Sequence, residues 1–283
     1  MNYKKAVLHI SEQTNLPENQ SWWLLESITQ KSRAALIATD YELLELEEKQ
    51  LDEAIHEIAV KSKPLAYILG WVPFLDLEIL VKTPILIPRP ETEEWVHQVI
   101  TMMNKQAEKE QDQFTILDIG SGSGCIALSL AQAFPLAQIY GVDINPQALE
   151  LARTNAIKND IKNVTFIESD LFTKIPLNLK FDLIVSNPPY IDPAVKLDAS
   201  VTSWEDHGAL FANNAGLSII EQIITQAPNH LKKNNELEYQ LVIEIDSTQG
   251  QIVEELYSSS KFKTIKIRKD QFDRDRTVWA NSK

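Results

Sequence analysis

The 283-residue chain has one cysteine, Cys125, and five histidines that lack the regular spacing of metal ligands. A single thiol forms neither an internal disulfide nor a thiolate zinc site, so we expect no disulfide framework and no metal centre. No uninterrupted apolar stretch of about 18 residues occurs, so the sequence predicts no membrane span. The N-terminal apolar run is too short for a signal peptide and no arginine-rich presequence is evident. We therefore expect a cytoplasmic protein, with an organellar location left open.

Positive charge is also scarce, because 27 lysines and arginines stand against 40 aspartates and glutamates, a net charge of −13. Proteins bind nucleic acid largely by neutralising phosphates, so this balance disfavours DNA or RNA as a direct partner. It is compatible with a basic protein partner. The chain is 44% hydrophobic and 24% charged, which is typical of a soluble globular protein with a sizeable core.

The most informative stretch is FDLIVSNPPY, residues 181–190. Residues 181–186 are mostly apolar and predict a short strand that is buried on both faces, as in a parallel sheet. Pro188 and Pro189 cannot donate to a strand ladder, so the strand must end before them. Asn187 is thereby placed at the carboxyl edge of the sheet, where open α/β folds bind ligands.

These residue types suit one chemical task, which is to hold a planar amino group. The side-chain oxygen of Asn187 can accept one N–H and the carbonyl of Pro188 the other, while Tyr190 can stack on the flat target. A nitrogen that attacks an electrophilic methyl group gains positive charge, so both acceptors then bind it more strongly and lower the barrier. The residues alone leave open a plain Asn-Pro turn without function.

A second stretch has the character of a ligand-binding turn. Residues 114–119 predict a buried strand that leads into GSGSG, residues 120–124, and then into a helical pattern. Glycines at such a turn let the backbone approach a ligand closely. The next predicted strand ends in Asp143, at about the offset of 20 residues where an acid meets ribose hydroxyls. A third strand leads to SDLF, residues 169–172, which we expect to border an adenine.

The remaining pattern predicts the domain organisation. Residues 1–70 read as amphipathic helices, residues 71–90 as a hairpin linker, and residues 91–283 as alternating strands and helices. That alternation implies a parallel sheet with right-handed crossovers, and the last two strands are expected to pair antiparallel at its edge. Thr92 is predicted to cap a helix over 93–105. Residues 192–214 are predicted to be a long, structureless loop that packs over the substrate.

Four motifs in this order, DIGSGSG, VDINP, SDLF and SNPPY, resemble the class I S-adenosylmethionine-dependent methyltransferases. Two upstream segments, PLAYILG at 64–70 and LIPRPETE at 86–93, narrow the resemblance to the peptide-chain release factor glutamine N5-methyltransferases, the PrmC/HemK family. The resemblance covers roughly residues 32–280. It implies an α/β fold with a Rossmann-like class I methyltransferase sheet, mostly parallel with an antiparallel edge strand, and a small N-terminal helical domain that grips the substrate.

The resemblance also implies the reaction and the site. A methyl group passes from S-adenosyl-L-methionine to the side-chain nitrogen of the glutamine in the Gly-Gly-Gln tripeptide of class I release factors. The implied catalytic residues are Asn187, Pro188 and Tyr190, and substrate binding adds Pro189, Arg89 and Glu91. The implied cofactor site comprises Asp118, Gly120, Ser121, Gly122, Ser123, Gly124, Asp143, Asp170, Leu171 and Asn187.

Three alternatives stay open. A sister family methylates a glutamine of a large-subunit ribosomal protein, although the intact run RPETE here favours the release-factor branch. Asn-Pro-Pro-Tyr also suits the amino group of adenine, and a non-catalytic adaptor could retain the fold. The sequence departs from the family pattern at Ala215, where aspartate is usual, and at Asp246 and Asp273, where glycine is usual.

Overall fold

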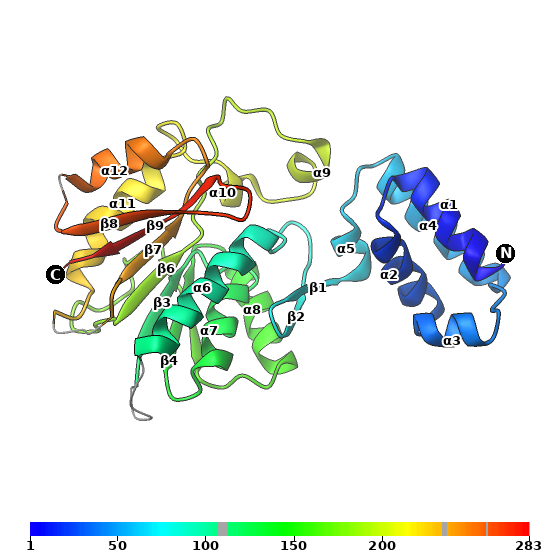
Figure 1. Ribbon diagram of the computed structural model, residues 1–283, viewed down its shortest axis with the longest axis horizontal. Helices are drawn as coiled ribbons and strands as arrows, with labels where there is room; N and C mark the ends of the chain where they lie inside the picture. Colours follow the sequence, from blue (N-terminus) through cyan, green and yellow to red (C-terminus); the bar gives the residue numbers. More distant parts are fainter. Residues whose placement is uncertain (107–112, 234–236, 259, 283) are drawn as a thin grey trace. The chain divides into compact units, whose positions relative to one another are not determined.

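A computed structural model describes residues 1–106, 113–233, 237–258 and 260–282 (Figure 1). The chain forms two units. The smaller comprises Met1–Trp71 together with Leu197–Trp204, and the larger comprises Val72–Lys196 together with Glu205–Lys283. No helix in the described part of the chain is long and apolar enough to cross a membrane.

The smaller unit is helical. Its helices are α1 (Tyr3–Thr14), α2 (Glu18–Thr29), α3 (Arg33–Ala38), α4 (Glu45–Ala59), α5 (Leu65–Leu69) and α9 (Ala199–Thr202). Apolar residues at helical spacing turn one face of each longer helix inward, and Ile10, Leu24 and Leu51 are fully buried in the shared core. The side chain of Asn2 accepts a hydrogen bond from the backbone at the start of α1, which satisfies one free N–H of that helix.

The larger unit contains a seven-stranded sheet in the order β5-β4-β3-β6-β7-β9-β8. Its strands are β3 (Thr115–Ile119), β4 (Gln138–Asp143), β5 (Val164–Glu168), β6 (Leu183–Ser186), β7 (Leu241–Glu244), β8 (Thr264–Lys269) and β9 (Asp275–Asn281). The first five in space pair parallel, whereas β9 pairs antiparallel with both β7 and β8. This confirms the predicted fold class, including the antiparallel strands at one edge.

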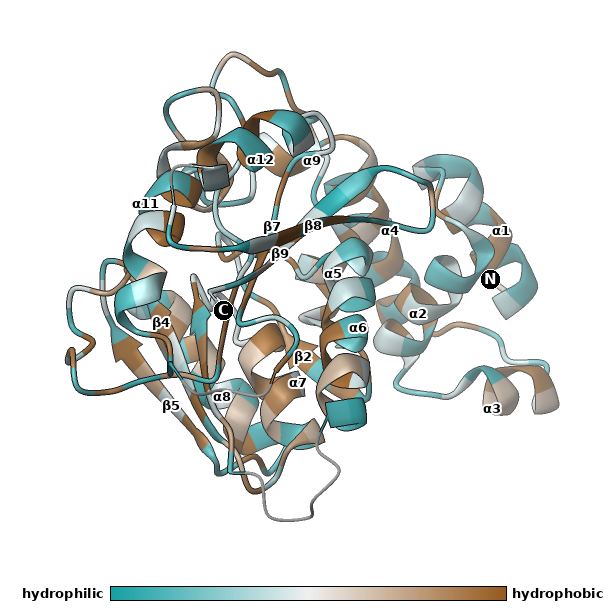
Figure 2. Cartoon of the chain, turned by 60° about the vertical axis from the view of Figure 1, so that its left-hand side comes forward, coloured by the Kyte–Doolittle hydropathy of each residue, from teal (hydrophilic) through white to brown (hydrophobic). Residues whose placement is uncertain are grey.

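Helices cover both faces of the sheet (Figure 1). One layer contains α6 (Pro90–Gln106), α7 (Cys125–Ala133) and α8 (Pro146–Lys158), and the other contains α11 (Ser218–Gln226) and α12 (Gly250–Ser258). Alternate strand residues such as Leu117 and Ile119 join the core beneath α11 and α12. All four residues of β6 are buried, as its continuous apolar run predicts. In Figure 2, α7 is mostly brown because most of its residues are apolar and buried.

A hairpin of β1 (Trp71–Phe74) and β2 (Leu77–Leu80) precedes the sheet in the chain. Buried Asn155 of α8 joins this hairpin to the glycine turn after β3. Its Oδ1 accepts from the backbone N of Leu80 at 2.8 Å, and its Nδ2 donates to the carbonyl of Leu80 at 3.1 Å and to that of Ser123 at 2.9 Å. One amide thus satisfies backbone groups of two segments far apart in the sequence.

Two sequence predictions of local structure are wrong. Residues 192–214 are not structureless, since they contain α9 and α10 (His207–Leu210), whose first turns are capped by the side chains of Asp198 and Asp206. Helix α6 begins at Pro90, so Thr92 lies within the helix and is not its cap. The physical reason is that proline, with its fixed φ and no N–H, is well suited to the first helical position.

Candidate active site

A cavity of about 370 Å³ opens at the carboxyl ends of the parallel strands. Because the chain runs from β3 to β4 and β5 on one side of the sheet and returns to β6 on the other, this is the position where such sheets bind ligands. Its lining residues come from the ends of β3, β4, β5 and β6 and the segments that follow them, with others from 85–86, 206–209 and α11: Ile85, Leu86, Ile119, Gly120, Gly122, Asp143, Ile144, Asn145, Ala148, Ser169, Asp170, Leu171, Ser186, Asn187, Pro188, Pro189, Asp206, Gly208, Ala209 and Ile219.

The glycine turn after β3 is held by backbone hydrogen bonds. The N–H groups of Gly120 and Ser121 both donate to the carbonyl of Val142, at 2.8 and 2.9 Å. Gly120 and Gly122 have φ values of 73° and 54°, in the left-handed region that favours glycine. At Gly141 of β4, an added Cβ would lie 2.5 Å from Ser121 Oγ, so the turn packs directly against that strand.

Asp143 at the end of β4 faces the turn. Its Oδ2 accepts from the N–H of Gly122 at 2.8 Å and its Oδ1 from that of Asn145 at 2.8 Å. Burial raises the pKa of this carboxyl group, while the two backbone hydrogen bonds act in the opposite direction. A carboxylate fixed in this way at the rim of a cavity can accept hydrogen bonds from a ribose diol.

The ten sequence-predicted cofactor residues fall into two groups. Those that line the cavity are Gly120, Gly122, Asp143, Asp170, Leu171 and Asn187. Those that lie outside its lining are Asp118, Ser121, Ser123 and Gly124. Asp118 is fully buried, and its Oδ2 accepts from Ser121 Oγ at 2.8 Å. Burial raises the pKa of Asp118 to about 7. Its carboxyl group binds Ser121 of the turn and does not line the cavity.

The Asn-Pro-Pro-Tyr segment begins where β6 ends. Ser186 Oγ donates to the carbonyl of Ile119 at 2.8 Å, which ties this segment to the end of β3. Asn187, Pro188 and Pro189 line the cavity. Asn187 Nδ2 donates to Thr92 Oγ1 at 3.0 Å, and no donor among the described residues binds its side-chain oxygen.

Tyr190 is placed differently from the three residues before it. It is not part of the cavity lining, and its hydroxyl donates to Glu244 Oε1 at 3.0 Å. Burial, followed by the negative charge of Glu244, raises the pKa of Tyr190 well above its ordinary value. The phenol is therefore held as a neutral hydrogen-bond donor next to Asn187, Pro188 and Pro189 in the chain.

The two remaining predicted residues lie at the start of α6. Arg89 Nη2 donates to both oxygens of Glu205, at 2.7 and 2.6 Å, and the Glu205 side chain is 1% exposed. Burial raises the pKa of Glu205, and the charge of Arg89 opposes that rise. Glu91 is half-buried in the first turn of α6. Arg89 thus fixes the position of Glu205, and the next residue, Asp206, lines the cavity.

Sequence reasoning missed several residues that shape this site, chiefly Thr92, Asn155, Asp206 and Glu244. Glu244 had a readable signal, because a charged residue at the end of an otherwise apolar, buried strand requires partners. The others are common polar residues in ordinary helical or turn contexts. Their roles depend on which segments pack against them.

A mostly parallel sheet, a glycine turn after its first strand and an acid after its second form a Rossmann-like fold. The match of this region to a methyltransferase domain makes the class a Rossmann-like methyltransferase. Solved structures agree on the fold. A methyltransferase from Pyrococcus furiosus matches with a TM-score of 0.50 at 13% identity, over 82% of this chain and 98% of that one. The hMettl16 catalytic domain matches with a TM-score of 0.55 at 14% identity, over 84% and 82%. Residues 110–274 match the model of a methyltransferase domain.

The chain belongs to the release factor glutamine methyltransferase family. Residues 4–70 match the PrmC N-terminal domain. The release factor glutamine methyltransferase of Lactococcus lactis subsp. lactis is 43% identical over 244 residues, 85% of this chain and 83% of that one. Its counterpart in Flavobacterium psychrophilum is 36% identical over 283 residues, 99% and 96% of the two chains. The family predicted from the motifs is confirmed.

S-adenosylmethionine is accordingly the cofactor, as the sequence predicted. The cavity fits its chemistry, because the donor combines a cationic sulfonium and ammonium with a ribose and an adenine. Carboxylates of Asp143, Asp170 and Asp206 border the cavity, and Ile144 and Leu171 supply apolar surface for a planar ring.

Proposed function

We propose that this protein transfers a methyl group from S-adenosylmethionine to the side-chain nitrogen of the glutamine in the Gly-Gly-Gln tripeptide of a class I peptide-chain release factor. One observation carries the proposal. Asn187 and Pro188, which carry the two proposed amide acceptors, line the same cavity as Gly120, Gly122 and Asp143. A donor held at one end and a side-chain amide held at the other would meet within it.

On the donor side, we assign Asp143 to the ribose hydroxyls and the backbone of Gly120 and Gly122 to close contact with the donor. Leu171 and Asp170 would border the adenine. The bound cofactor supplies an electrophilic methyl group on a cationic sulfur. The surrounding carboxylates favour a ligand of that charge over its neutral product.

On the acceptor side, Asn187 Oδ1 and the carbonyl of Pro188 would take the two N–H groups of the glutamine amide. This fixes the nitrogen and aims it along one direction, which removes much of the entropic barrier. The nitrogen gains positive charge as the new N–C bond forms and the S–C bond of the donor breaks, and the methylated amide then loses one N–H proton to water. Two preorganised oxygen dipoles in a partly apolar cavity stabilise that charge more than water would.

For the rest of the chain, we propose that residues 1–70 grip the protein substrate, that 71–90 act as a linker, and that 91–283 carry the reaction. The substrate serves translation, so we place the reaction in the cytoplasm. The net charge of −13 favours a basic protein surface over nucleic acid and argues against adenine as the acceptor.

The test uses the purified full chain with S-adenosylmethionine and three acceptors: a class I release factor, a large-subunit ribosomal protein and an adenine-containing oligonucleotide. Mass spectrometry of the digested release factor is expected to show one added methyl group on the Gly-Gly-Gln peptide. A release factor whose tripeptide glutamine is replaced by glutamate is the matched control and should remain unmodified. Methylation of the oligonucleotide, or an unmodified tripeptide, would overturn the proposal.

A further inference from the structure

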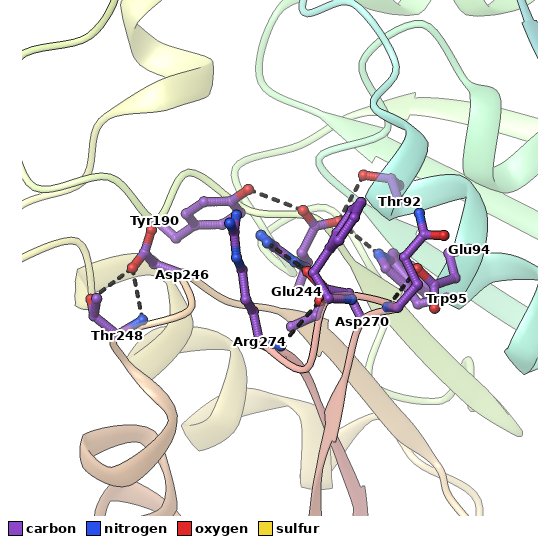
Figure 3. A network of polar contacts seen from close by, with 12 residues as sticks. Thr92, Glu94, Trp95, Tyr190, Glu244, Asp246, Thr248, Asp270 and Arg274 are labelled. Carbon is purple, nitrogen blue, oxygen red and sulfur yellow. Dashed lines mark hydrogen bonds and ion pairs between the residues drawn. The ribbon is translucent and has the colours of Figure 1, made fainter.

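Glu244 is a buried carboxylate at the end of β7, next to β6 in the sheet. The residue is 1% exposed, and no cation of the described residues forms an ion pair with it. Three neutral donors surround it instead, as Figure 3 shows. Thr92 Oγ1 and Trp95 Nε1 each lie 2.7 Å from Oε2, and the Tyr190 hydroxyl lies 3.0 Å from Oε1.

The chemistry of these groups sets the direction of every hydrogen bond. The indole N–H of Trp95 can only donate, and the Thr92 hydroxyl donates to Glu244 Oε2. Burial raises the pKa of Glu244, while the hydrogen bonds from Trp95, Thr92 and Tyr190 and the positive charge of Arg276 act in the opposite direction. The lone pairs of Thr92 Oγ1 are then the groups that face Asn187, 3.0 Å away. The Asn187 atom at that position must be the donor Nδ2. The amide oxygen is consequently turned the other way.

We propose that Glu244 is the positioning residue for the Asn187–Tyr190 segment, orienting Asn187 through the Thr92 hydroxyl and holding Tyr190 directly. This proposal rests on the proposed function for its catalytic meaning, and it assigns a task that the Asn-Pro-Pro-Tyr motif cannot perform alone. Asparagine has two ends of nearly equal shape, and only one of them can accept an N–H. The Glu244–Thr92 pair selects the accepting end.

The same arrangement strengthens the acceptor. Hydrogen bonds in a chain polarise one another, and the effect is larger where the surroundings are apolar. Glu244 polarises the Thr92 hydroxyl by accepting its hydrogen bond. This polarisation makes Thr92 Oγ1 a better acceptor of the hydrogen bond from Asn187 Nδ2. Electron density then shifts toward Asn187 Oδ1, the atom assigned to the glutamine N–H. The stabilisation grows as positive charge develops on the substrate nitrogen, so its loss should lower kcat more than donor affinity.

The decisive variants are Thr92→Val and Thr92→Ser, because valine keeps the shape and removes the hydroxyl while serine keeps the hydroxyl. Thr92→Val is expected to lower kcat with the release factor by about 10- to 100-fold, the cost of losing one buried hydrogen bond. The Kd for S-adenosylmethionine should change little, and Thr92→Ser should recover most of kcat. Equal kcat for the valine and serine variants would overturn the proposal.

A second kinetic test uses Glu244→Gln alone and combined with Thr92→Val. If both residues act through one path, the double variant should be no slower than the slower single variant. A loss of kcat in the double variant equal to the product of the two single losses would show that the two side chains act independently. That result would overturn the relay, the hydrogen-bond chain from Glu244 through Thr92 to Asn187. Thermal unfolding of each variant identifies any that fail to fold, and Thr92→Val remains interpretable in that case because it leaves the carboxylate in place.

A third readout needs no turnover, so it separates failure of this relay from failure of the proposed function. In the wild-type protein, one Asn187 side-chain N–H bonded to Thr92 should exchange slowly with solvent in NMR spectra, with its resonance identified by its absence in Asn187→Ala. Thr92→Val should accelerate that exchange by at least about tenfold, and Thr92→Ser should not. Unchanged exchange in the valine variant would overturn the relay even if the enzyme methylates its substrate.

Discussion

Two turns meet at the cavity, one at the end of β3 and one at the end of the adjacent β6. They differ in the groups whose hydrogen bonds hold them in place. In the glycine turn the backbone N–H groups are the donors, to the carbonyl of Val142 and to the carboxylate of Asp143 in the next strand, and Asn155 of α8 donates to the carbonyl of Ser123. The Asn-Pro-Pro-Tyr turn is held by side chains from α6 and β7, and Thr92 and Glu244 are separated by 152 positions in the sequence.

This difference indicates that the two neighbouring turns have different tasks, cofactor binding for one and orientation of the acceptor for the other. The two turns are close, since a Cβ on Gly120 would lie 3.8 Å from the carbonyl oxygen of Asn187. A backbone-built turn suits a cofactor that must be approached closely, and few substitutions are tolerated there. A side-chain-built turn suits an acceptor whose hydrogen-bond direction must be selected. Changes on the first side should therefore alter donor affinity, and changes on the second should alter turnover.

The strongest challenge to that division is Asn187→Ala. Removal of one preorganised hydrogen-bonding group at the reacting centre is expected to lower kcat by about 100- to 1,000-fold, while the Kd for S-adenosylmethionine changes only a few-fold. Single-turnover kinetics and calorimetry measure the two quantities. Asn213→Ala, at an exposed asparagine, is the matched control and should behave like the wild type. A comparable loss in both quantities would mean that the two turns do not divide the work.

The converse variant, Asp143→Asn, should produce the opposite profile. The two oxygens of Asp143 accept from Gly122 and Asn145, and asparagine can supply only one acceptor, so one backbone N–H loses its partner. We expect the Kd for S-adenosylmethionine to rise by about 10- to 100-fold, with kcat at saturating donor nearly unchanged. A kcat that falls as steeply as affinity would contradict the assignment of Asp143 to the donor alone.

A smaller effect concerns the charge beneath the glycine turn. Burial raises the pKa of Asp118 from 3.8 to about 7, so the folded protein retains a proton that the unfolded chain has lost between those values. The unfolding free energy should therefore fall as pH rises through that window and level off above pH 7, by about 1 kcal/mol between pH 5 and pH 6.

Urea unfolding of the wild type and of Asp118→Asn across this range measures the difference between the two slopes. The asparagine variant has no proton to lose, so the Asp118 contribution to the slope should vanish in it. Identical pH profiles for the two proteins would show that Asp118 is already ionised in the folded state. Other titrating groups contribute equally to both profiles and cancel in the comparison.

The sequence predictions were accurate where neighbouring residues determine the structure and failed where they do not. The strands, the glycine turn and the end of β6 were predicted because apolar runs, glycines and prolines act on their immediate neighbours. The start of α6 was misplaced at Thr92 because Pro90 initiates the helix. The short helices α9 and α10 were missed because four residues are too few to show a period.

By itself, the sequence determined the order of the elements, the backbone-built turn and the presence of an asparagine at the edge of the sheet, since each depends on local conformational preference. Only the tertiary structure decided which way that asparagine faces and that Tyr190 bonds to Glu244 outside the cavity lining. It also decided that Arg89 is paired with buried Glu205. Hydrogen-bond direction depends on partners brought together by packing, and sequence spacing carries no information about those partners.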